Sequence, residues 1–384
     1  MRFVSVALLS LTSSTTAFSP MSGSAVMSLL RCSPAAYTAF YLRPAGATAM
    51  PASSRTAISM AKTGAKASMD EVGKDGAFQR TDSAFRSWIK ADGSSEFSPE
   101  AGRYHLVIAN ACPWACRANA VRMLKGLDGA IDLTVVDPVF TRTRPENDGD
   151  QHCGWFFREN DKFMEATSVR DLYDKVSSNT DKFTVPILFD KKTNKIVNNE
   201  SSEIIRMLNS EFNSIANNPD LDLYPEAFRE EIDEINNWVY PMINNGVYKC
   251  GFATTQAAYD VAVKELFDGL DQVEDILSSQ RYITSRNAIT EADVRLFKTL
   301  VRFDEVYVQH FKCNKKRIAD YPNMENYVRE IYQIPEIGKT VNMKEIKEHY
   351  FCSHPTINKY SIIAVGPGVD YSQAHDREVK FPLE

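Results

Sequence analysis

A short apolar run that stops at a cysteine and a proline places the strongest constraint on the fold of this chain. Residues 104–109 have the composition of a strand, which is predicted to end at Asn110-Ala111-Cys112-Pro113. Residues 114–125 have the pattern of a helix, whose first turn tolerates proline and which Gly126 ends. Residues 131–136 form a second apolar run. Because a helix joins the two runs, we expect two parallel strands.

The next elements along the chain extend this α/β pattern. An apolar run at 186–190 comes after Val185, and a second run at 195–198 comes after four polar residues, as in a β-hairpin. Residues 202–208 begin an amphipathic helix. This order, with a cysteine before the first helix and a Val-Pro pair before the hairpin, resembles that of thioredoxin-type folds.

Helical periodicity dominates the remainder, from Pro225 onward. The predicted fold class is therefore a thioredoxin-like α/β N-terminal domain followed by an all-α C-terminal domain. We predict five segments: a targeting presequence at 1–69, an irregular arm at 70–103, the thioredoxin-like domain at 104–218, the helical domain at 219–365 and a tail at 366–384.

Charge separates the first 69 residues from the rest. They contain six Lys or Arg and no Asp or Glu, whereas the whole chain of 384 residues has a net charge of −6. The acidic body argues against a nucleic-acid partner, because phosphate binding needs concentrated Lys and Arg. No apolar run of about 18 residues occurs, so no membrane span is expected. Seven scattered cysteines do not suggest a disulfide framework and favour a reducing compartment.

The start of the chain has the features of a targeting sequence in two parts. Arg2 and the apolar run at 3–11 have the pattern of a signal peptide. After Phe18, about fifty residues rich in Ser, Ala, Thr and Met have the composition of a transit peptide. The pair resembles the bipartite presequences of algae with complex plastids, so we predict the plastid stroma. A mitochondrial presequence and a plain secretory signal are the alternatives.

Between the presequence and the first strand, the polar arm at 70–103 is expected to become ordered on contact with the body, anchored by Phe78, Phe85 and Trp88.

Cys112 is the candidate nucleophile. It follows a strand and starts a helix, where the helix N-terminus and its free N–H groups favour thiolate over thiol. A buried structural cysteine is the alternative.

The residues around Cys112 decide between these interpretations. Asn110-Ala111-Cys112-Pro113-Trp114-Ala115-Cys116-Arg117 closely resembles the Asn-Pro-Cys-Pro-Trp-Ala-His-Arg signature of the glutathionyl-hydroquinone reductases, the xi class of glutathione transferases. Matching motifs continue in order to Gly366-Pro367. The resemblance implies catalysis by Cys112 through a mixed disulfide with glutathione as cosubstrate, no metal or nucleotide, and a homodimer to which the tail contributes.

The resemblance also assigns the glutathione site. Pro186 is expected to be a cis-proline that lets the backbone of Val185 bond the cysteinyl part of glutathione. Ser201 and the helix N-terminus would hold the γ-glutamyl carboxylate while Glu200 takes the amino group, although Ser201 has the pattern of an ordinary N-cap as well. Trp155 would lie beside the sulfur, and Lys182 would meet the glycyl carboxylate.

Three tyrosines, Tyr248, Tyr307 and Tyr350, match those that line the quinol pocket in this family. Their hydroxyls can hydrogen-bond the oxygens of a hydroquinone. In the same domain, Thr290 and Asp293 form a variant capping box, which is a folding signal.

Three positions depart from the family pattern. Ala111 replaces a proline, Cys116 replaces a histidine, and Lys182 replaces the usual arginine. Because lysine cannot make the bidentate contact of an arginine with a carboxylate, the change at Lys182 is expected to weaken glutathione binding. Cys116 lies four residues after Cys112 and either resolves the mixed disulfide or packs against the sheet. We favour packing, because a disulfide needs Cβ atoms closer than i, i+4 spacing gives.

The predicted function is glutathione-dependent reduction of glutathionyl-(hydro)quinones. A general thiol transferase or dehydroascorbate-type enzyme, and a non-catalytic glutathione-binding redox module, are the alternatives. A conjugating transferase is disfavoured, because those usually activate glutathione with Ser or Tyr. His152-Cys153 stands alone, so no metal site is expected.

Overall fold

The computed structural model describes residues 65–66, 68–159, 163–177 and 180–382. The chain separates into two compact units, Met1–Ser59 and Met60–Glu384, and the second contains all of the described residues. The predicted presequence lies outside the described residues except for its last few positions, so its assignment stays a prediction. Because Met60–Glu384 is one compact unit, the predicted boundary at residue 218 also stays a prediction.

A four-stranded mixed sheet in the order β2-β1-β5-β6 forms the first part of the fold. Strands β1 and β2 are parallel, while β5 is antiparallel to both β1 and β6. The strands are β1 (Tyr104–Ile108), β2 (Asp132–Val135), β5 (Ile187–Asp190) and β6 (Lys195–Asn198). The parallel pair and the hairpin are confirmed. A separate ribbon of β3 (Thr141–Arg142) and β4 (Cys153–Gly154) stands beside α2 (Val169–Val176).

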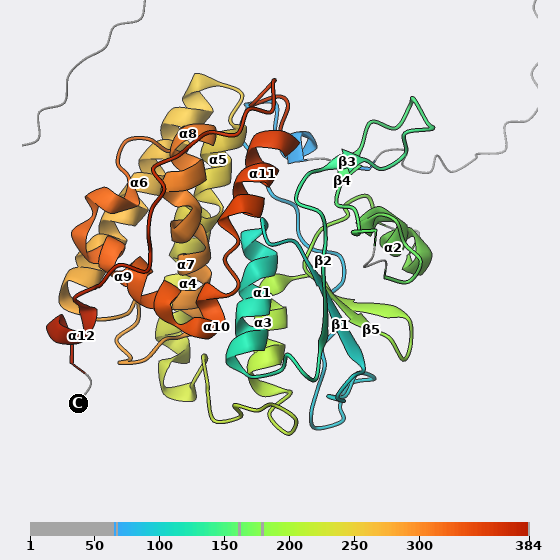
Figure 1. The fold of residues 1–384 in the computed structure, drawn as a ribbon, viewed down its shortest axis with the longest axis horizontal. Helices are drawn as coiled ribbons and strands as arrows, with labels where there is room; N and C mark the ends of the chain where they lie inside the picture. The colour runs from blue at the N-terminus through green and yellow to red at the C-terminus, as the bar shows by residue number, and fades with distance from the viewer. Residues whose placement is uncertain (1–64, 67, 160–162, 178–179, 383–384) are drawn as a thin grey trace, which may run out of the picture. The chain divides into compact units, whose positions relative to one another are not determined.

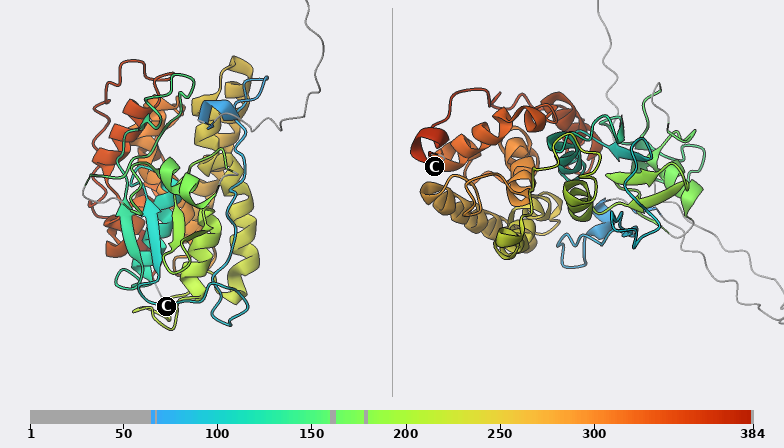
Figure 2. Two further views of the ribbon diagram at one scale, coloured as in Figure 1. Left: turned by 90° about the vertical axis from the view of Figure 1, so that its right-hand side faces the viewer. Right: turned by 90° about the horizontal axis from the view of Figure 1, so that it is seen from below.

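Helices α1 (Pro113–Leu124) and α3 (Ser201–Ser210) lie side by side between the sheet and the helical part (Figure 1; Figure 2). Helix α1 packs against α7 (Glu291–Arg302). Ten of the twelve residues of α1 are buried, so this helix is core to both halves. A thioredoxin-like α/β domain followed by an all-α domain is therefore the observed fold class.

The helical part is built around α7, whose N-terminus carries the predicted capping box. Both the N–H and the hydroxyl of Thr290 donate to Asp293, and burial raises the pKa of that carboxyl. The remaining helices are α4 (Arg229–Val239), α5 (Gly246–Phe252), α6 (Gln256–Ser279), α8 (Val308–His310), α9 (Pro322–Gln333), α10 (Pro335–Gly338), α11 (Met343–Ser353) and α12 (Arg377–Lys380). Two π-helical turns, Tyr240–Asn244 and Phe303–Tyr307, precede α5 and α8. Among the described residues, no helix is long and apolar enough to cross a membrane.

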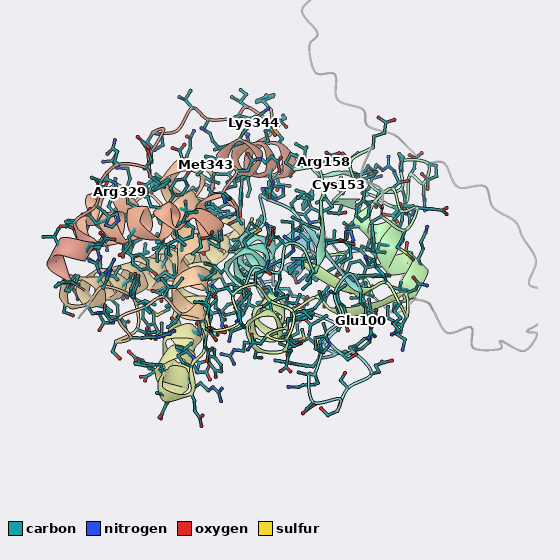
Figure 3. All side chains as sticks on the ribbon, turned by 60° about the horizontal axis from the view of Figure 1, so that its bottom comes forward. Glu100, Cys153, Arg158, Arg329, Met343 and Lys344 are labelled. Atoms are coloured by element: carbon teal, nitrogen blue, oxygen red, sulfur yellow. The ribbon has the colours of Figure 1, made fainter. Side chains whose placement is uncertain are left out.

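The arm ties the two parts of the fold together. Phe78 is buried and its ring lies 5.2 Å from that of Phe252 in α5. Phe85 packs edge-on against Tyr173 of α2, at 5.7 Å between ring centroids. Apart from the arm, Arg158 after β4 pairs with Glu345 of α11 at 2.8 Å. Figure 3 labels Arg158 together with Met343 and Lys344, the first two residues of α11. The arm is thus a structural part of the body.

The tail packs on the helical part of its own chain. The N–H of Val369 donates to Glu305 at 2.8 Å, and the hydroxyl of Tyr371 donates to the carbonyl of Val301 at 3.2 Å. Arg377 is fully buried and donates to three carbonyl groups at the end of α6 and just beyond it. The tail therefore packs as part of the helical domain of its own chain.

Candidate active site

Two neighbouring cavities share Trp114 in their lining. The first, of about 220 Å³, is lined mainly by polar groups from the arm and the start of α3, and we call it the polar cavity. The second, of about 470 Å³, holds Cys112 and many aromatic side chains, and we call it the aromatic cavity. Six residues line both and define the junction: Lys66, Arg80, Trp114, Lys182, Thr184 and Val185.

Cys112 is the N-cap residue of α1, and its carbonyl accepts the Cys116 N–H at 2.9 Å. Its side chain is half-buried, and Sγ lies 3.8 Å from the carbonyl oxygen of Val185. The Val185-Pro186 peptide bond is cis, as expected. The thiol thus faces the strand edge at the junction of the two cavities.

The ionisation of Cys112 corrects the expectation of a ready-made thiolate. Burial raises the pKa of the Cys112 thiol to about 11, and the N–H groups of Ala115 and Trp114 offset only part of this rise. The helix N-terminus acts in the predicted direction, but loss of hydration outweighs it. The resting group is a thiol at neutral pH.

Cys116 points away from both cavities. It is fully buried, and its Sγ–H donates to the carbonyl of Asn110 at 2.9 Å. Cys112 and Cys116 are both free thiols. This geometry agrees with a packing role for Cys116.

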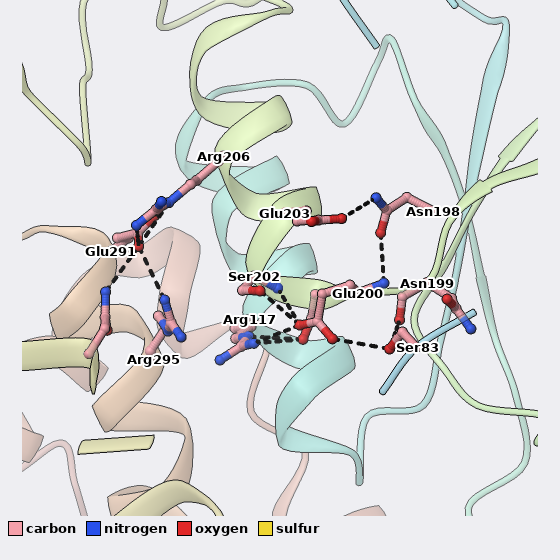
Figure 4. A network of polar contacts seen from close by, with 12 residues as sticks. Ser83, Arg117, Asn198, Asn199, Glu200, Ser202, Glu203, Arg206, Glu291 and Arg295 are labelled. Atoms are coloured by element: carbon pink, nitrogen blue, oxygen red, sulfur yellow. Dashed lines mark hydrogen bonds and ion pairs between the residues drawn. The ribbon is translucent and has the colours of Figure 1, made fainter. Parts of the chain in front are cut away.

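Glu200 caps α3 and anchors the polar cavity (Figure 4). Its carboxylate accepts the Ser202 N–H at 3.0 Å, the Ser202 hydroxyl at 2.8 Å and the Ser83 hydroxyl at 3.0 Å. Although burial opposes ionisation, Arg117 and these hydrogen bonds hold the pKa of Glu200 below its usual range. Glu200 is therefore a carboxylate fixed at a helix N-terminus.

Ser201 is the first residue of α3 and lies inside the helix, which corrects its interpretation as an N-cap. Its hydroxyl accepts two bonds from the Arg117 guanidinium, at 3.1 and 2.8 Å. The Nη1 of Arg117 is buried and has no hydrogen-bond partner among the described residues, while burial lowers the pKa of this group to about 9. Arg117 and Ser201 thus leave one unsatisfied donor at the polar cavity.

Lys182 lies at the junction but is already engaged. Its ammonium pairs with Glu71 at 2.6 Å and donates to the carbonyl and hydroxyl of Thr81 at 3.2 and 3.3 Å. Burial lowers the pKa of Lys182, and its hydrogen bond contributes to the lowered pKa of Glu71. The charge of Lys182 is therefore compensated by the arm.

Tyr248 and Tyr350 line the aromatic cavity, with their hydroxyl oxygens 2.7 Å apart. Tyr307 does not line it, which corrects the expectation that all three tyrosines would. Its side chain is buried behind Tyr350, and the two hydroxyl oxygens are 3.0 Å apart. Burial raises the pKa of Tyr248 to about 12. The three phenols form one neutral chain of hydrogen bonds.

Trp155 and three histidines, His152, His349 and His354, also line the aromatic cavity. Trp155 stacks on His349 at 4.6 Å between ring centroids. Burial lowers the pKa of His152 and of His354 to about 4, and that of His349 well below its usual value. These imidazoles are neutral at pH 7. Within the described parts of the chain, no group of three or more His, Cys, Asp or Glu is placed to hold a metal ion.

Comparisons with known proteins agree on one family. Models for the N-terminal and the C-terminal domain of glutathione S-transferases match residues 111–211 and 256–330. The glutathionyl-hydroquinone reductase YqjG of Escherichia coli is 46% identical over 327 residues, covering 81% of this chain and 95% of that protein. The glutathionyl-hydroquinone reductase PcpF of Sphingobium chlorophenolicum is 43% identical over 304 residues, covering 78% of this chain and 92% of that protein.

The chain belongs to the glutathionyl-hydroquinone reductase family, the Xi class of glutathione transferases.

Solved structures support the same assignment. The Xi transferase of Phanerochaete chrysosporium has a TM-score of 0.72 and 47% identity, covering 79% of this chain and 97% of that one. The glutathione-bound structure of YqjG from Escherichia coli has a TM-score of 0.71 and 45% identity, covering 77% and 97%.

Sequence reasoning missed several residues of this family member's cavities. The arm was expected only to anchor itself, yet Arg80 and Ser83 line the cavities. Lys66, within the segment predicted as presequence, lines both cavities as well. His349 and His354 were not singled out as site residues. Of these residues, Arg117 could have been found from the sequence. It lies within the signature around Cys112, and a buried arginine beside a candidate anion site needs acceptors.

Proposed function

We propose that this protein reduces glutathionyl-hydroquinones to hydroquinones at the expense of glutathione, with Cys112 as the nucleophile. One observation carries the proposal: Cys112 lines the aromatic cavity, and its Sγ lies 3.8 Å from the carbonyl oxygen of Val185, which lines the polar cavity as well. A conjugate between a charged tripeptide and an aryl ring needs such a pair of cavities, with its sulfur at the junction.

The reaction consists of two thiol exchanges. Cys112 sulfur attacks the sulfur of the conjugate, so that an S–S bond forms and the C–S bond to the ring breaks. The two sulfur atoms are oxidised to a disulfide, and the ring carbon is reduced and takes a proton. A second glutathione then attacks the mixed disulfide, releasing oxidised glutathione and restoring the Cys112 thiol.

The polar cavity fits the γ-glutamyl end of glutathione. The unsatisfied Nη1 of Arg117 and the N-terminus of α3 are donors for its carboxylate, and the ionised Glu200 is an acceptor for its amino group. Val185 and Pro186 supply the edge that the cysteinyl backbone meets. Lys182 and Trp155 keep their proposed roles at the glycyl and sulfur ends, and Lys182 would exchange Glu71 for the glycyl carboxylate.

The aromatic cavity fits the ring. The hydroxyls of Tyr248 and Tyr350 are placed to hydrogen-bond the hydroquinone oxygens and to pass a proton to them. Tyr307 would act through Tyr350 as a positioning residue.

Mass spectrometry tests the proposal. After mixing with glutathionyl-menadione without free glutathione, the protein is expected to gain one glutathione on Cys112, and Cys112→Ser is expected to gain none. Cys116→Ser is the matched control, because Cys116 lies on the same helix but faces away. Normal turnover by Cys112→Ser would contradict the mechanism.

The homodimer belongs to the proposal as well. Between α11 and the tail, four apolar side chains stand exposed: Tyr360 (75%), Ile362 (69%), Ile363 (42%) and Val365 (89%). A second copy of the chain would bury them. Ile362→Asp with Val365→Asp is expected to shift the protein from dimer to monomer in light scattering, and a wild-type monomer would contradict this.

We also propose the plastid stroma as the location, on the strength of residues 1–69 alone. A fluorescent protein fused after residue 69 is expected to reach the plastid, whereas a fusion lacking residues 1–17 is expected to stay in the cytosol. The six cysteines of the described residues are free thiols, which suits a reducing compartment.

A further inference from the structure

Arg80 of the arm lines both cavities at the junction and has no part in the mechanism described above. Its guanidinium lies over the rings of Trp114 and Tyr248, at 5.1 and 5.0 Å from their centroids. It also lies 5.4 Å from the ring of Phe78, and its Nε donates to the side chain of Asn245 at 2.9 Å. The arginine is thus held by aromatic faces and a neutral amide in the cavity that Cys112 and Tyr248 also line.

The other cations that line the aromatic cavity are compensated. Lys66 pairs with Asp181 at 2.8 Å, and Lys182 pairs with Glu71 at 2.6 Å. The lining histidines are neutral at pH 7. Among the described residues that line this cavity, Arg80 is the cation without a carboxylate in ion-pair contact.

One more cation lies close by but faces elsewhere. Arg302 is fully buried behind the Cys112 loop and donates to the carbonyls of Asn110 and Ala111. It lines neither cavity. Arg80 is therefore the positive charge that a bound ring would meet.

The proposed reaction creates negative charge at this place. A proton first moves from the ring hydroxyl next to the sulfur onto the carbon that carries the sulfur, leaving a carbonyl. When Cys112 takes the sulfur, the electron pair of the C–S bond flows to that carbonyl oxygen and leaves a phenolate. The phenolate finally takes the proton that the Cys112 thiol gave up, so that atoms and electrons balance.

We propose that Arg80 binds the oxygen of the departing hydroquinone and stabilises it as a phenolate. The inference rests on the function proposed above. The oxygen lies only three bonds from the sulfur, and the sulfur must lie at the junction that Arg80 and Trp114 line. In a cavity walled by aromatic rings, a cation acts on such a charge more strongly than it would in water.

The first half-reaction isolates this role. Formation of the Cys112–glutathione disulfide is followed by rapid-quench mass spectrometry for wild type, Arg80→Met and Arg80→Lys. We expect Arg80→Met to slow this step about 30- to 100-fold, and Arg80→Lys to restore part of the rate. Arg229→Met is the matched control, since Arg229 also lies over a tyrosine ring, at 5.3 Å, but lines neither cavity.

A second readout separates leaving-group stabilisation from a structural role. In a series of substrates from methylated to chlorinated rings, the rate of Arg80→Met is expected to depend more steeply on the pKa of the leaving phenol than that of wild type. The second half-reaction, in which glutathione reduces the preformed Cys112 disulfide, releases no phenolate and is expected to keep its rate.

The possible results distinguish failure of the role of Arg80 from failure of the proposed function. Equal slopes for wild type and Arg80→Met, or equal losses in both half-reactions, would overturn the role of Arg80 while leaving the proposed function intact. If wild type forms no adduct on Cys112, the proposed function fails, and the inference fails with it.

Discussion

The polar cavity and the aromatic cavity treat charge in opposite ways. In the polar cavity, Glu200 stays ionised because Arg117 and several hydroxyl and N–H donors surround it. In the aromatic cavity, burial keeps Cys112, Tyr248 and the histidines neutral. The charges of glutathione do not change during the reaction, so fixed charges in the polar cavity bind it best. The aromatic cavity must move a proton, so its groups start neutral. The polar cavity therefore binds one end of the substrate, and the aromatic cavity carries out the chemistry at the other end.

Among the variants considered, Tyr248→Phe is expected to have the largest effect, on the chemistry in the aromatic cavity. Removing the hydroxyl should lower kcat about 100-fold with little change in the KM for glutathione, because a proton donor is lost while the polar cavity is intact. Steady-state kinetics with glutathionyl-menadione measures both. Tyr259→Phe is the control, since its hydroxyl bonds the carbonyl of Lys312 outside both cavities. An unchanged kcat would mean that the aromatic cavity selects by shape alone.

Glu200→Gln tests the binding side. The variant keeps the cap of α3 but loses the charge, so the KM for glutathione should rise about 10- to 50-fold while kcat at saturation is preserved. Isothermal titration with glutathione measures the binding directly. Glu211→Gln, at the other end of α3, is the matched control. A fall in kcat with unchanged KM would reverse the assignment of the two cavities.

As the pH falls, the buried histidines at the aromatic cavity should lower the stability of the fold before the polar cavity is affected. Burial lowers the pKa of His152 and His354, which line the aromatic cavity, to about 4, from the usual 6.5. It lowers the pKa of His310, whose Nε2 lies 3.2 Å from Nδ1 of His354, to about 3. The unfolded chain therefore binds more protons below pH 6.5, so their contribution is complete above that pH and declines as the pH falls. Between pH 7.5 and 5.5 the free energy of unfolding should drop by about 1 kcal/mol per histidine. Urea unfolding measures the drop, and His354→Gln should reduce it.

Glu71→Gln tests how Lys182 contributes to glutathione binding at the junction. Removing this carboxylate frees Lys182, so the KM for glutathione should fall about 3- to 10-fold. Lys182→Met should raise it, and the double variant should resemble Lys182→Met. If Glu71→Gln weakens glutathione binding instead, the Glu71–Lys182 pair is needed to hold the arm in place.

Cys116→Ala should have the smallest effect, less than about twofold on turnover, because its thiol faces the carbonyl of Asn110. Intact mass during turnover should show the same Cys112–glutathione species in both proteins. A Cys112–Cys116 disulfide in wild type, with turnover lost in the variant, would overturn the single-thiol route.

Local signals explain what the sequence predicted well. The Cys-Pro pair after an apolar run located the end of β1 and the start of α1, and Thr290 with Asp293 located the start of α7. Each depends on backbone geometry within a few residues. The family resemblance added the cis Val185-Pro186 bond, which no local pattern specifies.

The remaining features depend on contacts between distant segments. Lys182 meets Glu71 across 111 positions, and Arg80 meets Asn245 across 165. The raised pKa of Cys112 depends on how completely the surrounding fold excludes water, which its place at a helix start does not reveal. Tyr307 matched the family as well as Tyr350 did, and only packing shows which one reaches the cavity.

The two π-helical turns change how the helices beside the aromatic cavity respond to a change in chain length. Each holds an i→i−5 hydrogen bond, from Asn245 to Tyr240 and from Val308 to Phe303, so each turn holds one more residue than an α-helical turn. Because the wide turn takes up this extra residue, deleting one residue from Tyr240–Asn244 would restore α-helical pairing and leave Tyr248 on the same face of its helix. Single-residue deletions in this turn should therefore be better tolerated among functional variants than deletions in a neighbouring α-helical turn, where each removed residue turns the rest of the helix by about 100°.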